Sequence, residues 1–305
     1  MPTEPISHQG PERIPGPVFI LLAATLWGTT GTTQALAPNA ATPIAVGWLR
    51  LAVGGGALMA LALWRGRFRD RSGWMRPAVA VSGLSTAVYQ ACFFAGVSLT
   101  GVAVGTIVGI GSSPIFAGIL GWAARGERLR RRWFLATGLA VTGCALLALS
   151  GGEDAAVDPV GLLLALGAGL AYAIFTLVNK RLIETRPPDA VMAVAFCIGA
   201  VVALPALLFV DTGWIATPGG IAVALHLGLI ATGLSYLFFG QGLRTTPVST
   251  TGTLTLAEPL TAALLGILLL DETLTATALI GIGVLLAGLL VLVAPSRRRV
   301  MLPPG

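Results

Sequence analysis

The chain has 305 residues, of which 55% are hydrophobic and only 10% are charged, and its mean hydropathy is +0.86. Soluble globular proteins carry about 25% charged residues, so this composition excludes a soluble globular chain. Ten apolar runs are each long enough for a transmembrane helix, which needs about 20 residues. They leave too few residues for a large domain outside the bilayer. They are also too long and too uniformly apolar to be the strands of a β-barrel.

The apolar runs predict an all-α polytopic membrane protein with ten transmembrane helices. The runs end at proline, glycine or charged residues, which are typical of turns and loops. A polar tail of residues 1–17 precedes the first helix, and a second tail, residues 295–305, follows the last. The predicted helices span residues 18–37, 43–64, 74–97, 102–123, 133–150, 159–179, 190–210, 218–242, 248–270 and 275–294.

The basic residues predict how these helices are oriented in the membrane. The chain has 19 Lys and Arg residues and a formal net charge of +6. All of them except Arg50 lie in the two tails or in loops after even-numbered helices, whereas charged residues in the opposite loops are all acidic. Loops rich in Lys and Arg face the cytoplasm, so both termini are expected to be cytoplasmic. The basic loops are expected to contact anionic lipid, and no nucleic-acid partner is expected.

An internal repeat relates the two halves of the chain at a constant offset of 145 residues. Residues 18–150 and 159–294 each contain five predicted helices, and an outer linker, residues 151–158, joins them. Because five is odd, the second half enters the membrane from the opposite side. Secondary transporters that work by alternating access have this inverted-topology repeat. The paired positions include Gly83 with Gly228, Pro114 with Pro259, Glu127 with Glu272, and Gly143 with Gly288.

Several of these segments resemble a known family. The stretch from Pro114 to Leu129 returns from Pro259 to Leu274, each with a proline, an apolar run containing glycine, and an acidic ending. With Leu26-Trp27-Gly28 in the first helix, these segments resemble the EamA-like branch of the drug/metabolite transporter superfamily, over residues 18–294. The resemblance implies a central cavity lined by helices 1, 3, 4, 6, 8 and 9, with helices 5 and 10 more peripheral. Within this family, the bacterial inner-membrane exporters of aromatic amino acids look most similar.

Glu258 is the only acidic residue inside the ten predicted helices. It lies about ten residues into the ninth helix, and so roughly 15 Å deep at 1.5 Å per residue. Acidic side chains within a membrane usually face a cavity or a partner. Two interpretations stay open: a group that binds a proton or cation and couples transport, or a carboxyl that fixes the kink at Pro259. Pro114 and Pro259 are both expected to break their helices, because proline lacks a backbone donor.

Arg50 lies inside the second helix, at a depth within reach of Glu258. The two side chains could form a structural ion pair, or a free Arg50 could bind a substrate carboxylate, which guanidinium matches with paired hydrogen bonds. Because the second helix is expected to be peripheral, packing or outward snorkelling of Arg50 is favoured over substrate contact. The repeat lacks counterparts of both charges, since Ala195 replaces Arg50 and Ser113 replaces Glu258.

An aromatic residue and an amide recur seven residues apart, as Trp27 with Gln34 and as Tyr172 with Asn179. Seven residues are about two helical turns, so each pair lies on one helix face. The inverted repeat is expected to place the pairs on opposing walls of the cavity, around an amphipathic ligand. The alternative is that they pack and hydrogen-bond between helices.

Further residues extend this predicted lining. A four-residue spacing of small residues in the fourth helix mainly predicts close packing, and the serines beside Pro114 could also supply hydroxyl groups to a ligand. His226 is either a titrating group or a histidine satisfied by its neighbours. The remaining candidates are Tyr89, Gln90, Phe93, Ser112, Ser113, His226 and Tyr236.

These features favour a carrier over an enzyme or a passive channel. The sequence has no HExxH or GxSxG motif and no paired intramembrane carboxylates, so no catalysis, metal or cofactor is expected. The predicted function is export of small amphipathic metabolites, preferably aromatic or other hydrophobic amino acids, across the bacterial inner membrane. Nucleosides, sugars and organic cations are the alternative substrates. The protein is expected to be a monomer whose partners are a small-molecule substrate and the lipid bilayer.

Overall fold

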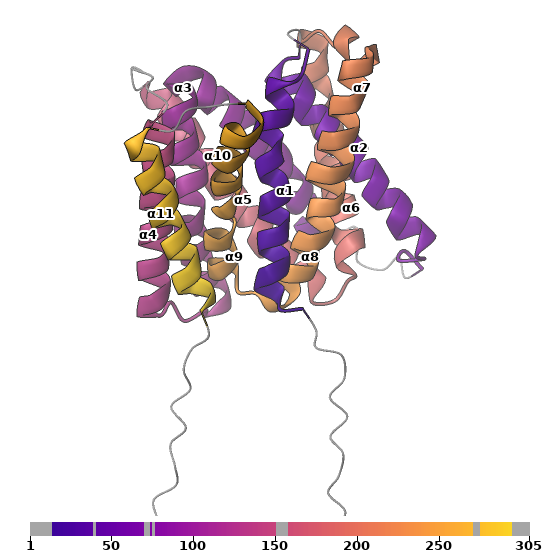
Figure 1. Cartoon of the computed structure of the whole chain (residues 1–305). Helices are drawn as coiled ribbons and strands as arrows, with labels where there is room; N and C mark the ends of the chain where they lie inside the picture. The colour runs from indigo at the N-terminus through magenta and orange to yellow at the C-terminus, as the bar shows by residue number, and fades with distance from the viewer. Residues whose placement is uncertain are drawn as a thin grey trace, which may run out of the picture.

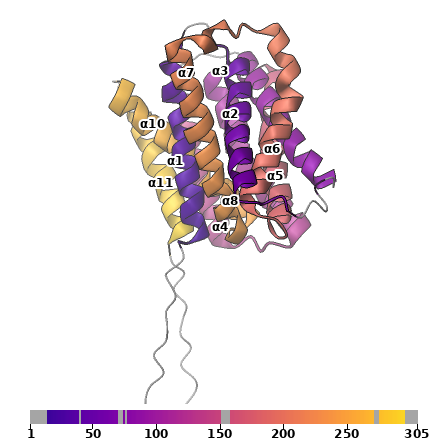
Figure 2. The same ribbon diagram turned by 90° about the vertical axis from the view of Figure 1, so that its right-hand side faces the viewer.

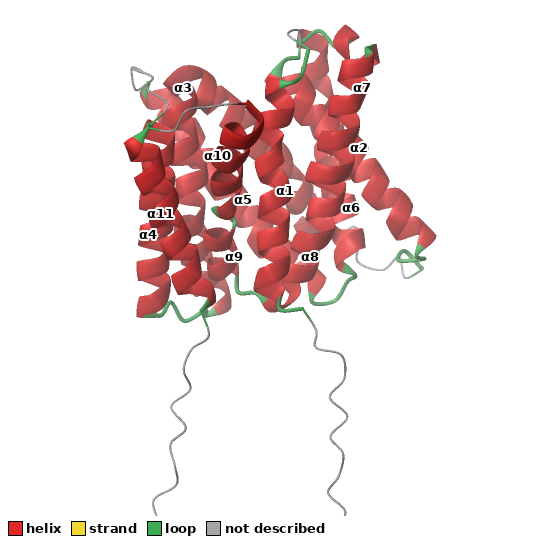
Figure 3. Cartoon of the chain, viewed as in Figure 1, coloured by secondary structure: helices red, strands yellow, loops and turns green. Residues whose placement is uncertain are grey.

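The structure, a computed structural model, describes residues 14–38, 41–69, 74, 77–150, 158–270 and 275–294. Throughout these residues it consists of helices and connecting turns, without strands (Figure 3). The all-α fold class is therefore confirmed. Residues 151–157 of the predicted linker, most of the two predicted tails, and Glu272 lie outside the described part.

The first half of the chain forms α1 (Gly16–Ala35), α2 (Pro43–Trp64), α3 (Pro77–Arg125) and α4 (Arg131–Leu149). α3 combines the third and fourth predicted helices, and it turns at Gly101, whose φ of 80° and ψ of 162° are not helical. Glycine reaches a positive φ without steric cost. Gly101 therefore joins two helical segments, residues 77–100 and 102–125, without an intervening loop.

The second half contains more interruptions than the first. α7, η3 and α8 form one continuous helical stretch with a π-helical centre, and α9 and α10 are separated only by a turn at Thr255 and Leu256. Its elements are α5 (Pro159–Ile183), α6 (Pro188–Ala203), η1 (Leu204–Phe209), η2 (Gly213–Ala216), α7 (Pro218–Leu225), η3 (His226–Leu234), α8 (Ser235–Thr245), α9 (Val248–Leu254), α10 (Ala257–Leu270) and α11 (Ala276–Val293).

Proline and side-chain caps fix where several helices begin. Pro159 and Pro218 occupy the first turn of α5 and α7, where the missing backbone N–H has no helical partner to lose. The preceding residues, Asp158 and Thr217, accept hydrogen bonds from free backbone N–H groups of that turn. The structure begins these helices at the residues that the sequence predicts.

Nine helical stretches among the described residues are long and apolar enough to cross a membrane. They correspond to the second to tenth predicted helices. α1 is not among them, and its residues 28–33 are all threonine or glycine. α1 nevertheless lies lengthwise against α8 and α10 (Figure 1). The count of ten transmembrane helices remains a prediction.

The helices run alternately between two ends of the bundle, named lower and upper as they appear in Figure 1. α1 begins and α11 ends at the lower end. α5 instead begins at the upper end, where Gly161 packs against Gly96 and Leu99 beside the turn of α3. Its other end brings Lys180 to the lower end of α8. The two halves of the chain therefore run in opposite directions.

Small residues let helices from the two halves approach closely. A Cβ atom on Gly54 of α2 would lie 2.5 Å from the Thr232 side chain of η3, and one on Gly143 of α4 would lie 2.4 Å from the backbone of Leu285 in α11. In the view of Figure 2, α2 lies beside α6 on one side, and α10 and α11 lie on the other. The interfaces between halves thus consist of closely packed helix pairs.

The largest hydrophobic cluster among the described residues fills much of the lower half of the bundle and reaches the cavity at Trp27 and Cys144. Its buried side chains include Ile20 near the start of α1, Met192 near the start of α6, and Leu243 near the end of α8. Phe239 and Leu254 lie in the same cluster. The lower half is therefore tightly closed, and the main cavity lies above it.

Candidate functional site

A cavity of about 760 Å³ lies between the two halves of the chain. Its lining reaches the upper end at Gln34 of α1, at Ser150 after α4 and at Ala278 of α11. It ends near mid-depth at Trp27, Tyr172 and other aromatic side chains. The volume is within the range of about 300–1,000 Å³ that is typical of small-molecule sites.

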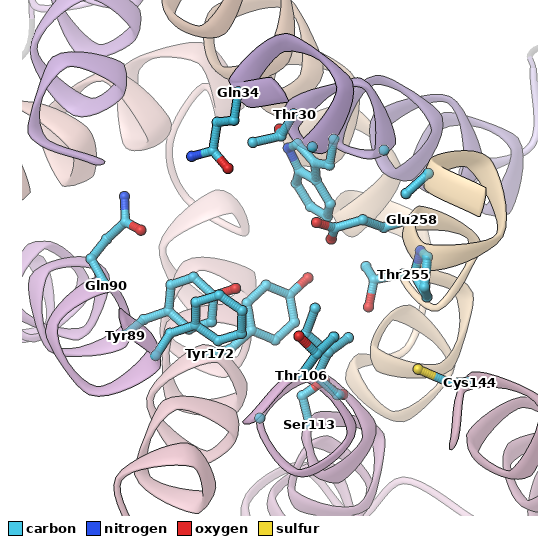
Figure 4. Close-up of a pocket in the computed structure, with 18 of the residues that line it drawn as sticks. Thr30, Gln34, Tyr89, Gln90, Thr106, Ser113, Cys144, Tyr172, Thr255 and Glu258 are labelled. Carbon is cyan, nitrogen blue, oxygen red and sulfur yellow. The ribbon is translucent and has the colours of Figure 1, made fainter. Parts of the chain in front are cut away.

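The break between α9 and α10 places Glu258 in the cavity wall. Glu258 lies in the first turn of α10, where its backbone N–H donates to the Thr255 carbonyl at 3.0 Å. Pro259 has no N–H to donate to that carbonyl, so the Glu258 bond replaces the missing helical one. The Glu258 carboxylate projects into the cavity, across from Gln90 (Figure 4). Among the described residues, no side chain forms an ion pair with it.

Arg50 also lines this cavity, which corrects the expectation that it lies away from it. α2 is not peripheral, because its glycines let it pack directly against η3 and α6. The Arg50 Nε atom donates to Thr232 Oγ1 at 3.4 Å, and that hydroxyl donates in turn to the Leu227 carbonyl at 2.8 Å. The first distance is long for a hydrogen bond. The terminal guanidinium nitrogens have no acceptor among the described residues.

Two hydroxyl groups in the lining also lack partners. The Tyr172 hydroxyl and the Thr30 hydroxyl are buried and form no hydrogen bond. Thr176 and Thr255 lie near Tyr172 and use their own hydroxyl protons on the carbonyls of Tyr172 and Gly252, and neither forms a hydrogen bond of normal geometry with the Tyr172 hydroxyl. Buried polar groups are nearly always hydrogen-bonded in folded proteins. Unpaired groups that face a cavity are therefore candidates for contact with a ligand.

Aromatic side chains close the cavity from below. The closest ring pairs join Tyr236 to Phe196, with centroids 4.3 Å apart, and Tyr236 to Trp27, at 4.9 Å. The Trp27 indole also donates to Ser235 Oγ at 2.9 Å, which fixes the ring. We call this cluster the aromatic floor, and its members are Trp27, Tyr89, Tyr172, Phe175, Phe196, Tyr236 and Phe239.

Below the aromatic floor, polar contacts join the halves at the lower end. Glu127, in the α3–α4 connection, accepts hydrogen bonds from the backbone N–H groups of Val248 and Ser249 at 2.7 and 2.9 Å. These groups begin α9 of the second half. Arg125 forms an ion pair with Glu184 at 2.6 Å, again between halves. These contacts close the end of the bundle at which the basic connections gather.

Another such contact joins α6 to the end of α2. Asp189 lies in the first turn of α6, is buried, and accepts from Arg65 at 3.1 Å and from Arg67 at 3.2 Å. Both arginines are partly exposed to solvent, so each pair contributes modestly by itself. The shared carboxylate nevertheless connects the halves once more at the lower end.

The structure separates the two amides that the repeat pairs. Gln34 lines the upper part of the cavity, whereas Asn179 is fully buried beneath it. Asn179 Nδ2 donates to the Phe175 carbonyl at 2.7 Å, and its Oδ1 accepts from Ser82 at 2.9 Å. α1 runs upward and α5 runs downward. The step from Trp27 to Gln34 therefore leads into the upper part of the cavity, whereas the step from Tyr172 to Asn179 leads below it. The expectation of amides on opposing cavity walls is wrong for Asn179.

Ser112 and His226 do not line the cavity either. The Ser112 hydroxyl packs against Gly169 of α5 and donates to the Gly109 carbonyl at 3.4 Å. His226 shares a 2.9 Å hydrogen bond with Thr29, so it is a histidine satisfied by a neighbouring helix. Both side chains face interhelical contacts, and both were expected in the lining.

The predicted break at Pro114 is absent, because α3 stays helical through it. Proline leaves the carbonyl four residues earlier without its usual donor. That carbonyl belongs to Ile110, and the Ser113 hydroxyl donates to it at 2.7 Å. Ser113 thus compensates for the proline and also reaches the cavity.

The cavity contains the other predicted residues and several that the sequence did not single out. Threonine, phenylalanine and cysteine are common in apolar helices, so nothing local distinguishes those that face a cavity. The predicted residues in the lining are Trp27, Gln34, Tyr89, Gln90, Phe93, Ser113, Tyr172, Tyr236 and Glu258, and the unpredicted ones include Thr30, Thr86, Phe94, Thr106, Cys144, Phe196, Thr232 and Thr255.

Known proteins share both the sequence and the fold. A model of the EamA-like transporter family matches the chain twice, over residues 14–149 and 159–294. The uncharacterized transporter YwfM of Bacillus subtilis is 46% identical over 282 residues, which cover 92% of this chain and 95% of that protein. The threonine/homoserine exporter RhtA of Escherichia coli is 33% identical over 284 residues, which cover 89% of each chain.

A solved crystal structure with 21% sequence identity has the same fold, with a TM-score of 0.78. The match covers 90% of this chain and 95% of that one. Family model, relatives and fold all extend over both halves of the chain, including the helices that form the cavity. This multi-pass membrane protein belongs to the EamA-like transporter family.

Proposed function

We propose that the protein exports amino acids with aromatic or other hydrophobic side chains across the bacterial inner membrane. The observation that carries this proposal is one cavity between inverted halves that combines the aromatic floor with the charged groups of Arg50 and Glu258. Aromatic rings provide apolar contact area for a substrate side chain. Charged and hydroxyl groups provide partners for its polar end. The proposed activity is transport without catalysis, so the substrate is released in the same chemical form in which it was bound.

The transport cycle is proposed to be alternating access by a monomer. The cavity reaches the upper end, which the basic residues predict to be the outer one, while Glu127 and Arg125 bind the second half at the lower end. Inverted halves can exchange these arrangements and so open the site to the other side. Both termini are then cytoplasmic, and lipid surrounds the bundle.

A second candidate substrate is threonine or homoserine. RhtA, the relative named for export of these amino acids, is similar over most of both chains. Hydroxyl groups of Thr30, Thr86 and Thr106 line the cavity and offer partners for a polar side chain. The two candidates share their amino and carboxylate groups and differ in the side chain that the cavity favours.

Counterflow into proteoliposomes tests the function and separates the candidates. Vesicles containing the purified protein and unlabelled tryptophan or threonine are diluted into a trace of the labelled amino acid. Transient accumulation of label, competed by phenylalanine and tyrosine, would support the proposal. Accumulation with threonine only would favour the second candidate. Empty vesicles provide the background, and no accumulation with either amino acid would contradict amino-acid export.

The same vesicles test whether Glu258 couples transport to protons. Uptake is compared with and without an imposed pH gradient, for the unmodified protein and for Glu258→Gln. A proton-coupled carrier accumulates substrate against its gradient only when the proton gradient is present. If Glu258→Gln keeps full transport under every gradient, Glu258 does not carry the proton.

A further inference from the structure

We propose that Arg50 and Glu258 together form a site for the zwitterionic end of a free α-amino acid. The Arg50 guanidinium binds the carboxylate, and the Glu258 carboxylate binds the ammonium group. This inference rests on the proposed function and identifies the part of the substrate that every transported amino acid shares. It also assigns one binding group to each half of the chain.

The first support is that neither charge forms an ion pair with a described residue. They line one cavity, yet no ion pair within 4.0 Å joins them or links either to another described residue. Arg50 has only the 3.4 Å contact with Thr232. Charged groups inside a membrane protein are costly unless they are paired. A ligand that carries both charges would pair both groups.

The second support comes from hydroxyl groups that share the cavity with these charges. The side chains of Tyr89, Tyr172 and Tyr236 line the same cavity as Arg50 and Glu258. The Tyr172 hydroxyl is buried without a hydrogen-bond partner. It can donate to a carboxylate or accept from an ammonium group. The region around the two charges is therefore equipped for a ligand with both kinds of polar group.

The charge pattern also selects against other classes of ligand. An organic cation would leave Arg50 unpaired, an anion would leave Glu258 unpaired, and an uncharged sugar or nucleoside would pair neither. The repeat-related positions of the two residues are Ala195 and Ser113, so the site has no symmetrical copy. An amino acid is therefore bound in one orientation, its carboxylate toward the first half and its ammonium toward the second.

The proposal is tested by binding of matched ligands to Arg50→Gln and Glu258→Gln in detergent. For tryptophan the ligands are tryptophan itself, tryptamine, which lacks the carboxylate, and indole-3-propionate, which lacks the amine. If counterflow selects threonine, the set is threonine, 1-amino-2-propanol and 3-hydroxybutyrate. Titration calorimetry measures each affinity. Arg244→Gln and Asp211→Asn, which change charges outside the cavity, are the controls.

We expect each variant to lose affinity for the amino acid and for only one of the two ligands that lack a charged group. A charge-assisted hydrogen bond contributes about 1.5–3 kcal/mol, so each variant should bind the amino acid about 10- to 140-fold more weakly. Arg50→Gln should not weaken binding of the amine, and Glu258→Gln should not weaken binding of the carboxylate. Thermal melting of each variant distinguishes this pattern from misfolding, which would weaken all ligands together.

Two other results have separate meanings. Unchanged affinity for the amino acid in both variants would overturn the zwitterion site while leaving amino-acid transport intact. An equal loss for all ligands in folded Arg50→Gln would also overturn it, because Arg50 would then act through the shape of the cavity. Absence of counterflow in the unmodified protein would instead contradict the proposed function itself.

Discussion

Lys180 and Glu127 form hydrogen bonds with the two ends of the turn that joins α8 to α9. The Lys180 ammonium donates to the carbonyls of Leu243, Arg244 and Thr246 at 2.5, 3.0 and 2.9 Å. The Glu127 carboxylate accepts from the first N–H groups of α9. The cation therefore lies at the negative end of one helix and the anion at the positive end of the next.

Replacing Lys180 should destabilise the protein. Lys180→Met removes the donor to three carbonyls at a helix end, and Lys180 is only 8% exposed. Leaving buried acceptors unpaired costs about 1–3 kcal/mol. Thermal melting in detergent should give a clearly lower Tm than for Arg181→Met, which removes an exposed neighbour with one carbonyl contact. Equal melting of the two variants would contradict the role of Lys180.

A cysteine at Gln34 should report access to the cavity from outside the cell. In a chain with Cys92, Cys144 and Cys197 replaced by alanine, Gln34→Cys places a thiol in the upper part of the cavity. A membrane-impermeant maleimide added to intact cells should modify it, and substrate should slow the reaction. Ala23→Cys, in the closed core of the same helix, should not react. Modification only after the membrane is opened would indicate the reverse orientation.

Loss of the Glu127 contact should shift the protein toward opening at the lower end. Glu127→Ala removes the acceptor for the first N–H groups of α9, and loss of such a cap costs about 0.5–2 kcal/mol. In the Gln34→Cys background, this variant should react more slowly with the maleimide than the parent does. Arg128→Ala, at an exposed neighbouring position, is the control. Equal reaction rates for Glu127→Ala and its parent would show that the Glu127 contact does not control which end of the cavity is open.

Gly28 should not tolerate even a methyl group. A Cβ atom there would lie 2.6 Å from Thr261 Cβ and 2.8 Å from the Glu258 carbonyl, so alanine must push α1 and α10 apart. Overpacking of this kind costs about 1–3 kcal/mol. Gly28→Ala should lower the Tm and reduce counterflow, because α10 carries Glu258. Gly138→Ala is the control, since a Cβ there meets nothing within 4 Å. A Gly28→Ala protein with unchanged Tm and transport would refute this close contact.

The helices were predictable because their signals are local. Apolar runs, the proline starts of α2, α5 and α7, and the caps before them depend only on neighbouring residues. The repeat also indicated the opposite directions of the two halves. Glu258 stood out because a charge in an apolar run is unusual at any orientation of the helix.

Contacts across the bundle were harder to predict. The sequence predicts a peripheral position for the helix of Arg50, because it does not reveal that the glycines of α2 bring this helix against η3. The repeat predicts a cavity position for Asn179 because it pairs positions in the two halves without indicating which end of the bundle is closed. In the sequence, Glu127 and Lys180 are charged residues near predicted loops. Their partners are backbone atoms, which no sequence pattern identifies.

The π-helical stretch η3 has no counterpart in the first half. The equivalent residues at the offset of 145 are 81–89, and there α3 is α-helical. A π-helix takes one more residue than an α-helix to close each turn of backbone hydrogen bonds, so the same number of residues winds differently in η3 and in α3. The halves are therefore not mechanically interchangeable, and opening toward one face of the membrane requires different deformations from opening toward the other. We expect the two directions of the cycle to have unequal barriers, so that turnover is faster one way than the other.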